Sequence, residues 1–334
     1  MRLLRWTAAL LALAAIGLAG AVAWWLNHPL PLAAATAELS IEPGTPPRDI
    51  AQAWVQAGVQ APAILLYEWF RWSGQSRKIR AGSYEIARGA TPFQLMQKMV
   101  QGDETLEHAR LIDGWTFRQW RGELAKAKAL KPVTAGWTDA QVMESLGAPG
   151  VSPEGRFFPD TYAYSKGVSD LTVMRRAYQA MQRKLAQAWE DRSPDSPLKS
   201  PDQALVLASI VEKETGVAAD RGMVAGVFSN RLRIGMPLQT DPSVIYGLGD
   251  QFDGTLHKRD LQADTPYNTY VRPGLPPTPI SMPGLASLRA AVRPDPTKAL
   301  YFVARGDGSS HFSESLAEHN RAVDMYQRAA SRQP

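Results

Sequence analysis

The chain has no cysteine among its 334 residues. Disulfides, thiolate metal sites and a cysteine nucleophile are therefore excluded. It also lacks a GxSxG elbow, a glycine-rich phosphate loop and a dinucleotide fingerprint. Histidine is scarce, and His311 and His319 have neither the HExxH spacing nor an evident third ligand. The sequence thus predicts no metal site. The missing cysteine is compatible with the cytoplasm or an oxidising compartment.

A strong charge of one sign is also absent. Lysine and arginine number 37 against 32 acidic residues, which gives a formal net charge of +5. This mild basicity suits an anionic membrane surface or an acidic polymer. It is too weak and too dispersed to indicate a nucleic-acid partner. Apolar residues make up 45% and charged residues 21% of a chain long enough for two modest domains or one large one.

One long uncharged run is present, from residue 6 to residue 26, and residues 1–5 before it contain two arginines. As a helix of roughly 20 residues this run would span a bilayer core of ~30 Å. Trp24 and Trp25 suit the membrane interface, and the arginines predict a cytoplasmic N-terminus. A cleaved signal peptide is the alternative, but the length and the closing tryptophans favour a retained anchor. Both interpretations place the rest of the chain outside the cytoplasm, with residues 27–39 as a linker.

A loose repeat follows the linker. Its unit is a short strand, a turn with glycine and threonine, and an amphipathic helix. Glycine permits the tight turn and threonine is expected to cap the helix. In the second unit Phe93, Met96 and Met99 are spaced as one buried apolar stripe. The strands and helices are expected at 39–41 and 47–57, at 84–86 and 92–100, and at 109–112 and 117–127.

The middle of the chain changes in composition. Residues 155–164 are rich in aromatics without a helical period, a helix is expected at 170–189, and residues 191–201 form a polar, proline-rich break. Asp202 is then expected to cap a helix that ends near Gly216.

That helix is apolar almost all round before it reaches Glu212 and Glu214. Such a pattern is typical of a buried helix whose end reaches a surface or cleft. The two glutamates are two residues apart and project roughly 200° from each other, so they do not form a facing pair. A carboxyl that emerges from apolar neighbours has a raised pKa, which a general acid needs. The alternative is a surface pair of charges at a helix end.

Two later segments carry grouped polar and aromatic residues. Gln239, Thr240 and Asp241 could hold sugar hydroxyls or could simply form a turn. The prolines of 272–279 exclude helix and central strand, and the tyrosines just before them suit one face of a sugar. A structural loop is the alternative. Residues 300–304 are expected to form a buried strand.

The chain resembles the MltG (YceG-like) endolytic murein transglycosylases from about Ile41 to Tyr326. The resemblance rests on the segments ASIVEKETG, NRLRIGMPLQTDPSVIYG, YNTY, GLPPTPI, LYFVARGDG with a following HF, and AEHNRAV. One detail departs, because the HF pair here follows two serines. The resemblance implies an α+β fold with an N-terminal transmembrane helix, a LysM-like αβ module at 41–105, a connecting strand–helix region at 106–155 and a mixed α/β lytic-transglycosylase catalytic domain at 156–330.

The resemblance also implies roles for single residues. Glu214 matches the family's acid/base glutamate, with Glu212 and Thr215 in support. No metal and no organic cofactor is called for. The residues expected to hold the sugars are Gln239, Thr240, Asp241, Tyr246, Tyr267, Asn268 and Tyr270.

The resemblance implies a single-pass inner-membrane protein whose catalytic domain lies in the periplasm. It would cleave the MurNAc–GlcNAc β-1,4 bond of nascent peptidoglycan, leave 1,6-anhydro-MurNAc ends and terminate strand elongation, with peptidoglycan synthases as candidate partners. Two alternatives stay open. One is a muramidase-type hydrolase, for which Asp241 is the candidate second carboxylate. The other is a peptidoglycan-binding or synthase-interaction protein without catalysis.

Overall fold

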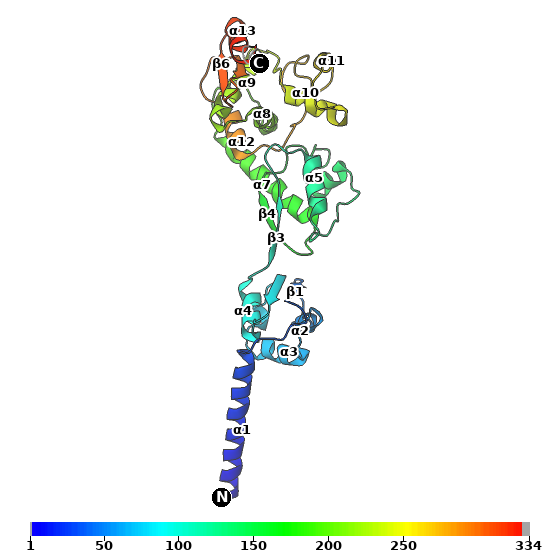
Figure 1. The fold of residues 1–334 in the computed structure, drawn as a ribbon, viewed down its shortest axis with the longest axis vertical. Coiled ribbons are helices and arrows are strands. Elements are labelled where there is room, and N and C mark those ends of the chain that lie inside the picture. Colours follow the sequence, from blue (N-terminus) through cyan, green and yellow to red (C-terminus); the bar gives the residue numbers. More distant parts are fainter. Residues whose placement is uncertain (1, 329–334) are drawn as a thin grey trace. The chain divides into compact units, whose positions relative to one another are not determined.

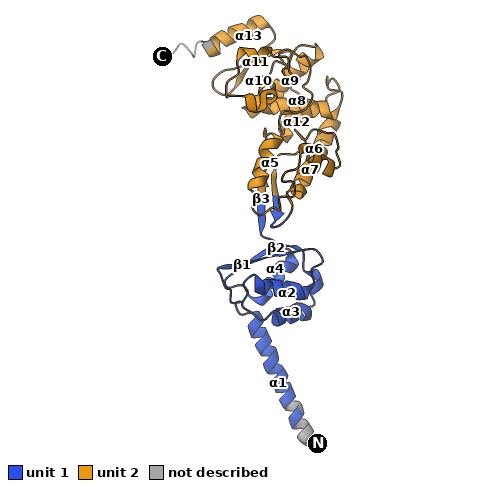
Figure 2. Cartoon of the chain, turned by 90° about the vertical axis from the view of Figure 1, so that its right-hand side faces the viewer, with its two compact units in different colours: residues 1–108, 163–168 blue, residues 109–162, 169–334 orange. Residues whose placement is uncertain are grey.

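The computed structural model describes residues 2–328 (Figure 1). They form two compact units, which are described separately (Figure 2). Among the described residues, unit 1 comprises 2–108 and 163–168, and unit 2 comprises 109–162 and 169–328. The division passes through strands β3 (Leu106–Arg110) and β4 (Thr161–Ser165), which pair in a two-stranded sheet.

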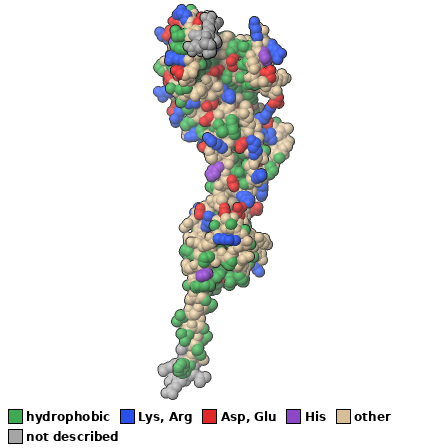
Figure 3. All heavy atoms as spheres, in the orientation of Figure 1, with side chains coloured by type: hydrophobic (Ala, Val, Ile, Leu, Met, Phe, Trp, Pro, Cys, Tyr) green, Lys and Arg blue, Asp and Glu red, His purple; other side chains and the backbone are tan. Residues whose placement is uncertain are grey.

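Unit 1 begins with helix α1 (Arg2–Leu26), whose described side chains are mostly exposed and largely apolar (Figure 3). Within residues 2–328, none of the helices combines the length and the apolar character that crossing a membrane requires.

The rest of unit 1 packs three helices around one two-stranded sheet. Strands β1 (Thr36–Ile41) and β2 (Gly82–Ala87) are antiparallel, with Leu39 opposite Tyr84. The helices are α2 (Pro47–Gln56), α3 (Ala63–Trp72) and α4 (Pro92–Gln101). Each strand and helix has one apolar face, and these faces pack against one another to form the core. The core includes Trp54, Phe70, Tyr84, Leu95, Met96 and Met99.

The strand–turn–helix order of the repeat is confirmed, with two corrections. Thr91 and Thr116 form capping boxes at the second and third helices, but Thr45 bonds back to the Glu42 carbonyl, and Pro46 occupies the N-cap of α2. The expectation for Phe93 is wrong, since its side chain is 46% exposed. The stripe that is buried runs through Pro92, Leu95, Met96 and Met99, where the i, i+3, i+4, i+7 spacing of a helix face is met.

Unit 2 is mainly helical. Its helices are α5 (Phe117–Lys126), α6 (Asp139–Ser145), α7 (Asp170–Glu190), α8 (Pro201–Glu214), α9 (Arg221–Arg233), α10 (Asp241–Leu248), α11 (Lys258–Gln262), α12 (Leu285–Val292) and α13 (Leu316–Val323). Strands β5 (Tyr301–Ala304) and β6 (Ser310–Ser313) pair antiparallel. The sequence predicts a turn or a helix cap at Asp241, where α10 begins, and helices α6 and α12 were not predicted from it.

Helix α8 is the centre of unit 2. All residues from Ala204 to Val211 are buried, and α7, α9 and α12 surround them (Figure 1). Its N-cap is Ser200, whose hydroxyl accepts from the Gln203 N–H, so the assignment of the cap to Asp202 is wrong. Proline at the first helical position places the start of the helix two residues earlier than expected, and Asp202 instead pairs with Arg156 at 2.6 Å.

The segment from Ile280 to Gly284 is bonded to α8 at three points. The Ile280 N–H donates to the Ser209 hydroxyl (3.0 Å), and the Ser281 hydroxyl donates to the Ser209 carbonyl (3.1 Å). The Gly284 N–H donates to Glu212 Oε2 (2.9 Å). The hydroxyl and the carbonyl of the fully buried Ser209 are thereby hydrogen-bonded, which apolar packing alone cannot achieve.

Candidate active site

Glu214 is the last residue of α8, where the buried helix leaves the core. Its Oε1 accepts a hydrogen bond of 2.5 Å from the Thr240 hydroxyl. Burial raises the pKa of Glu214, and the nearby charge of Asp241 raises it further. The Thr240 hydrogen bond and the Arg231 guanidinium oppose this rise without cancelling it. The site therefore contains a carboxyl that holds its proton to higher pH than an ordinary glutamate, as a general acid must.

The Thr240 side chain is fixed by its neighbours. Thr240 is 1% exposed, and its N–H donates to the Thr269 hydroxyl (3.0 Å), which also bonds the Ser243 hydroxyl (2.9 Å). Gln239 has a φ of +50°, the only described non-glycine residue in the left-handed region, and its N–H donates to the Thr269 carbonyl (3.0 Å). Such a conformation costs on the order of 1 kcal/mol or more and persists where the surroundings impose it. Two bonds to Thr269 impose it here.

Asp241 is already engaged by a tyrosine. The Tyr270 hydroxyl donates to Asp241 Oδ1 at 2.5 Å. Burial raises the pKa of Tyr270, and the hydrogen bond to Asp241 adds to the effect, so the phenol keeps its proton. Asp241 is the first residue of α10 and its charge acts on Glu214, so the structure brings Glu214, Thr240, Asp241 and Tyr270 together.

Arg231 supports this site from inside the core. Its guanidinium is 5.5 Å from the centre of the Tyr301 ring and donates to the carbonyls of Leu300 (2.7 Å) and Leu238 (2.5 Å). The Leu238 carbonyl lies directly before Gln239. Arg231 therefore ties the segment that carries Thr240 to strand β5.

Three of the residues expected to hold sugars make contacts within the fold, and of these Asn268 is buried whereas Tyr246 and Tyr267 are partly buried. Asn268 is completely buried and its side-chain amide donates to the carbonyls of residues 260, 261 and 263. These bonds stabilise the loop before Tyr270. The rings of Tyr246 and Tyr267 meet edge-to-face with centres 5.0 Å apart. The Tyr267 hydroxyl bonds that of Thr278 (2.8 Å), and both rings pack against the core.

Glu212 and Thr215 do not share the environment of Glu214. Glu212 bonds Gly284 and lies 4.0 Å from Arg221, whereas the Thr215 hydroxyl donates to the Val211 carbonyl (2.5 Å) as α8 ends. The prediction that the two glutamates project in different directions is confirmed, since they have no common partner. Glu212 contributes to a second group, where burial and its charge raise the pKa of Asp113.

Comparison with known proteins decides the family. A model of the YceG-like family matches residues 39–325. The chain belongs to the YceG-like family. It is 39% identical over 173 residues to the endolytic murein transglycosylase of Bacillus subtilis (strain 168), which covers 52% of this chain and 48% of that protein. It is 31% identical over 179 residues to the endolytic murein transglycosylase of Streptococcus pneumoniae serotype 2, which covers 51% of this chain and 31% of that protein.

A crystal structure supports the same assignment. A YceG-like protein from Listeria monocytogenes superimposes with a TM-score of 0.54 at 29% identity, covering 86% of this chain and 98% of that one. The resemblance and the mixed α+β class expected from the sequence are thus confirmed. This YceG-like chain spans about half the length of the first curated relative and about a third of the second.

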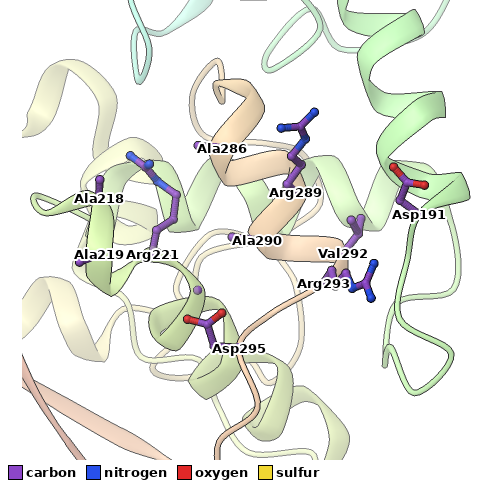
Figure 4. A pocket seen from close by; sticks show the side chains of 11 residues that line it. Asp191, Ala218, Ala219, Arg221, Ala286, Arg289, Ala290, Val292, Arg293 and Asp295 are labelled. Carbon is purple, nitrogen blue, oxygen red and sulfur yellow. The ribbon is translucent and has the colours of Figure 1, made fainter.

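A cavity of about 510 Å³ lies elsewhere in the YceG-like fold, between α9 and α12 (Figure 4). None of the residues expected from the sequence to form the site lines it. The guanidinium groups of Arg221, Arg289 and Arg293 point in different directions in this view, so they do not form a single anion cradle. The candidate active site is therefore at Glu214, whose carboxyl has the raised pKa, and not in this cavity.

The two histidines serve aromatic contacts. His319 stacks on Tyr301 with ring centres 5.3 Å apart, and His311 lies 5.6 Å from the ring of Tyr326. Across residues 2–328, no group of three or more His, Cys, Asp or Glu side chains is arranged to hold a metal ion.

Sequence reasoning missed Thr269, Ser243, Arg231 and Glu154. Glu154 is 5% exposed and its Oε2 accepts from the Tyr246 hydroxyl at 3.3 Å. A single buried glutamate in an aromatic-rich loop has no periodic signal. Only its position before Gly155, in a segment without helical period, set it apart.

Proposed function

We propose that this protein is an endolytic lytic transglycosylase that cleaves the MurNAc–GlcNAc β-1,4 bond of peptidoglycan. The observation that carries the proposal is Glu214, a single partly buried carboxyl of raised pKa bonded to the Thr240 hydroxyl. The names of the relatives from B. subtilis and S. pneumoniae support the reaction class.

A single carboxyl suffices for this reaction. Glu214 would protonate the oxygen that links MurNAc to GlcNAc, and that bond would break with an oxocarbenium-like centre at C1. Glu214, now a carboxylate, would accept the proton of the MurNAc C6 hydroxyl while that oxygen bonds to C1. The product is a 1,6-anhydro-MurNAc end, Glu214 is protonated again, and no water is consumed.

Thr240 has a defined part in this cycle. Its hydroxyl donates to Glu214 and so stabilises the carboxylate that exists between the two proton transfers. Burial favours the acid before the first transfer, and the hydrogen bond favours the base after it. The two effects together keep both forms of Glu214 accessible.

A hydrolase is the second candidate function, and one observation bears on it. Asp241 is close enough for its charge to act on Glu214 and could activate water. Its Oδ1 is held by the Tyr270 hydroxyl, which lowers its availability as a base. We therefore favour the transglycosylase.

Mass spectrometry of the products separates these functions. Full-length wild-type protein and the Glu214→Gln variant are each incubated in detergent with purified glycan strands. Glu212→Gln is the matched control, because it makes the same change two residues earlier on the same helix. Internal fragments with 1,6-anhydro ends, absent for Glu214→Gln and present for Glu212→Gln, would support the proposal. Reducing ends would indicate the hydrolase. Binding without cutting by the wild type would indicate a non-catalytic wall-binding protein.

The cellular setting is a further part of the proposal. We propose that residues 6–26 anchor the chain in the inner membrane with the catalytic domain in the periplasm, and that residues 41–105 act as a LysM-like module. Nascent strands near the synthases would then be the substrate. Membrane fractions washed with alkaline carbonate test the anchor, because a peripheral protein is released and an anchored one is retained.

A further inference from the structure

Glu154 is a buried carboxyl for which the proposed reaction has no use. It lies in the loop between α6 and β4. Both of its oxygens accept from the Phe117 N–H at 3.2 Å, at the first turn of α5, and Oε2 also accepts from the Tyr246 hydroxyl at 3.3 Å. Within the described part of the chain it has no ion pair. A carboxyl that is buried without a cation is costly, so its presence in the core calls for an explanation.

The charged and titratable groups around Glu154 are few. Burial raises the pKa of Glu154 to about 7, against the hydrogen bonds from Phe117, Tyr246 and Gly155. Tyr246 faces it from α10, and the charge of Asp139 at the start of α6 raises the pKa slightly further. Asp139 itself pairs with Arg121 of α5 at 2.9 Å. Glu154 therefore changes its charge close to neutral pH.

Helix α10 links Glu154 to the candidate active site. Thr240 precedes α10 and donates to Glu214, whereas Tyr246 lies six residues further along and donates to Glu154. At 1.5 Å per residue these two contacts are separated by roughly 9 Å of continuous helix. The charges that act on Glu214 are those of Asp241 and Arg231, and Glu154 is not among them. Any influence of Glu154 on Glu214 is therefore transmitted through the helix rather than through its field.

We propose that Glu154 is a positioning residue that holds α10 through the Tyr246 hydroxyl and so fixes the Thr240 hydroxyl against Glu214. Gly155 supports this placement, because a Cβ there would lie 2.4 Å from Pro279 and the loop packs closely on that segment. The activity part of the proposal rests on the function proposed above, and the structural part does not.

The charge of Glu154 affects how well it holds Tyr246. The carboxylate accepts from both donors at once, whereas the protonated form carries a hydrogen on one oxygen and loses an acceptor there. The hydrogen bonds of Glu154 to Phe117 and Tyr246 therefore strengthen as pH rises through about 7, even though the buried charge lowers the stability of the fold as a whole. Glutamine in place of Glu154 keeps one acceptor oxygen at every pH.

Three variants of the full-length protein test the proposal: Glu154→Ala, Glu154→Gln and Tyr246→Phe. Asp170→Asn is the matched control, because Asp170 is another carboxyl of unit 2 that is 6% exposed and accepts from the Thr134 hydroxyl at 2.6 Å. We expect Glu154→Ala to lower kcat about tenfold or more with KM nearly unchanged. Glu154→Gln should retain most of kcat and lose the change in rate near pH 7. Tyr246→Phe should lower kcat in the same direction as Glu154→Ala.

Amide hydrogen exchange of residues 241–248 gives a second readout that needs no activity. It should become at least tenfold faster in Glu154→Ala and stay unchanged in Asp170→Asn. Unchanged exchange in Glu154→Ala, or an equal loss of kcat in Asp170→Asn, would overturn the proposal. If Glu154→Ala does not fold, unchanged exchange and kcat in Tyr246→Phe overturn it. If the wild type does not cut glycan, the proposed function fails, and the exchange experiment still decides the positioning role.

Discussion

Glu154 makes the stability of unit 2 depend on pH in a direction opposite to that of a salt-bridged carboxylate. Its pKa is about 7 in the folded protein and 4.5 in the reference state. Between these pH values the folded chain holds a proton that the unfolded chain has released. Stability from this group is therefore complete below pH 4.5 and is lost as pH rises through 7. At 1.36 kcal/mol for each pKa unit, the loss is about 3 kcal/mol.

Glu154→Gln removes this dependence, because glutamine does not titrate. Relative to the wild type, the variant should gain about 3 kcal/mol in free energy of unfolding between pH 4.5 and pH 8. Urea denaturation of both proteins at four pH values, followed by intrinsic tryptophan fluorescence, measures this difference. A difference that stays constant across the range, or that falls as pH rises, would refute the reasoning.

Three further changes have defined outcomes. Thr240→Val removes the hydrogen bond that opposes the rise in the pKa of Glu214. The alkaline limb of the pH–rate profile should therefore move to higher pH, and kcat should fall about tenfold or more. Thr215→Val is the control and should leave the limb in place, because the Thr215 hydroxyl bonds the Val211 carbonyl instead. Gly155→Ala should destabilise the protein by about 2 kcal/mol or more in thermal unfolding, and Gly150→Ala by only about 1 kcal/mol. Both glycines have positive φ, but only at Gly155 would a Cβ strike a neighbour. Arg231→Met removes the donor to the buried Leu238 carbonyl and to the partly buried Leu300 carbonyl. It should cost about 2–4 kcal/mol in urea denaturation, and an unchanged midpoint would contradict this account.

Local features of the fold could be predicted from the sequence, because they depend on neighbours a few residues apart. The helix that carries Glu214, expected to end near Gly216 and observed to end at Glu214, and the divergence of Glu212 from Glu214 follow from helical geometry. The prediction of the helix cap was wrong where two residues could serve as the N-cap. Ser200 prevailed over Asp202 because Pro201 takes the first helical position. Phe93 matched the stripe by spacing alone, which does not define where the buried face of a helix ends.

The contacts that define the candidate site could not be read from the sequence. Thr240 bonds Glu214 across 26 positions, and Glu154 bonds Tyr246 across 92. Such pairings are set by how α10 packs on α8, and a single sequence contains no signal for that packing. Asn268 illustrates the same limit, since an amide near tyrosines suits a sugar or a loop carbonyl equally well until burial is known.

The three hydrogen bonds between the 280–284 segment and α8 fix the rotation of that helix about its axis. Each residue along a helix advances 100° about the axis, so a shift of α8 by one position would carry its terminal carboxyl to another side of the helix. Such a shift would also break the pairings of Ser209 and Glu212. Length changes in the stretch 191–197, which lies outside the core, should therefore be absorbed before α8 begins. One residue inserted within α8 beyond Ser209 would turn Glu214 away from Thr240 while most of the core remained packed.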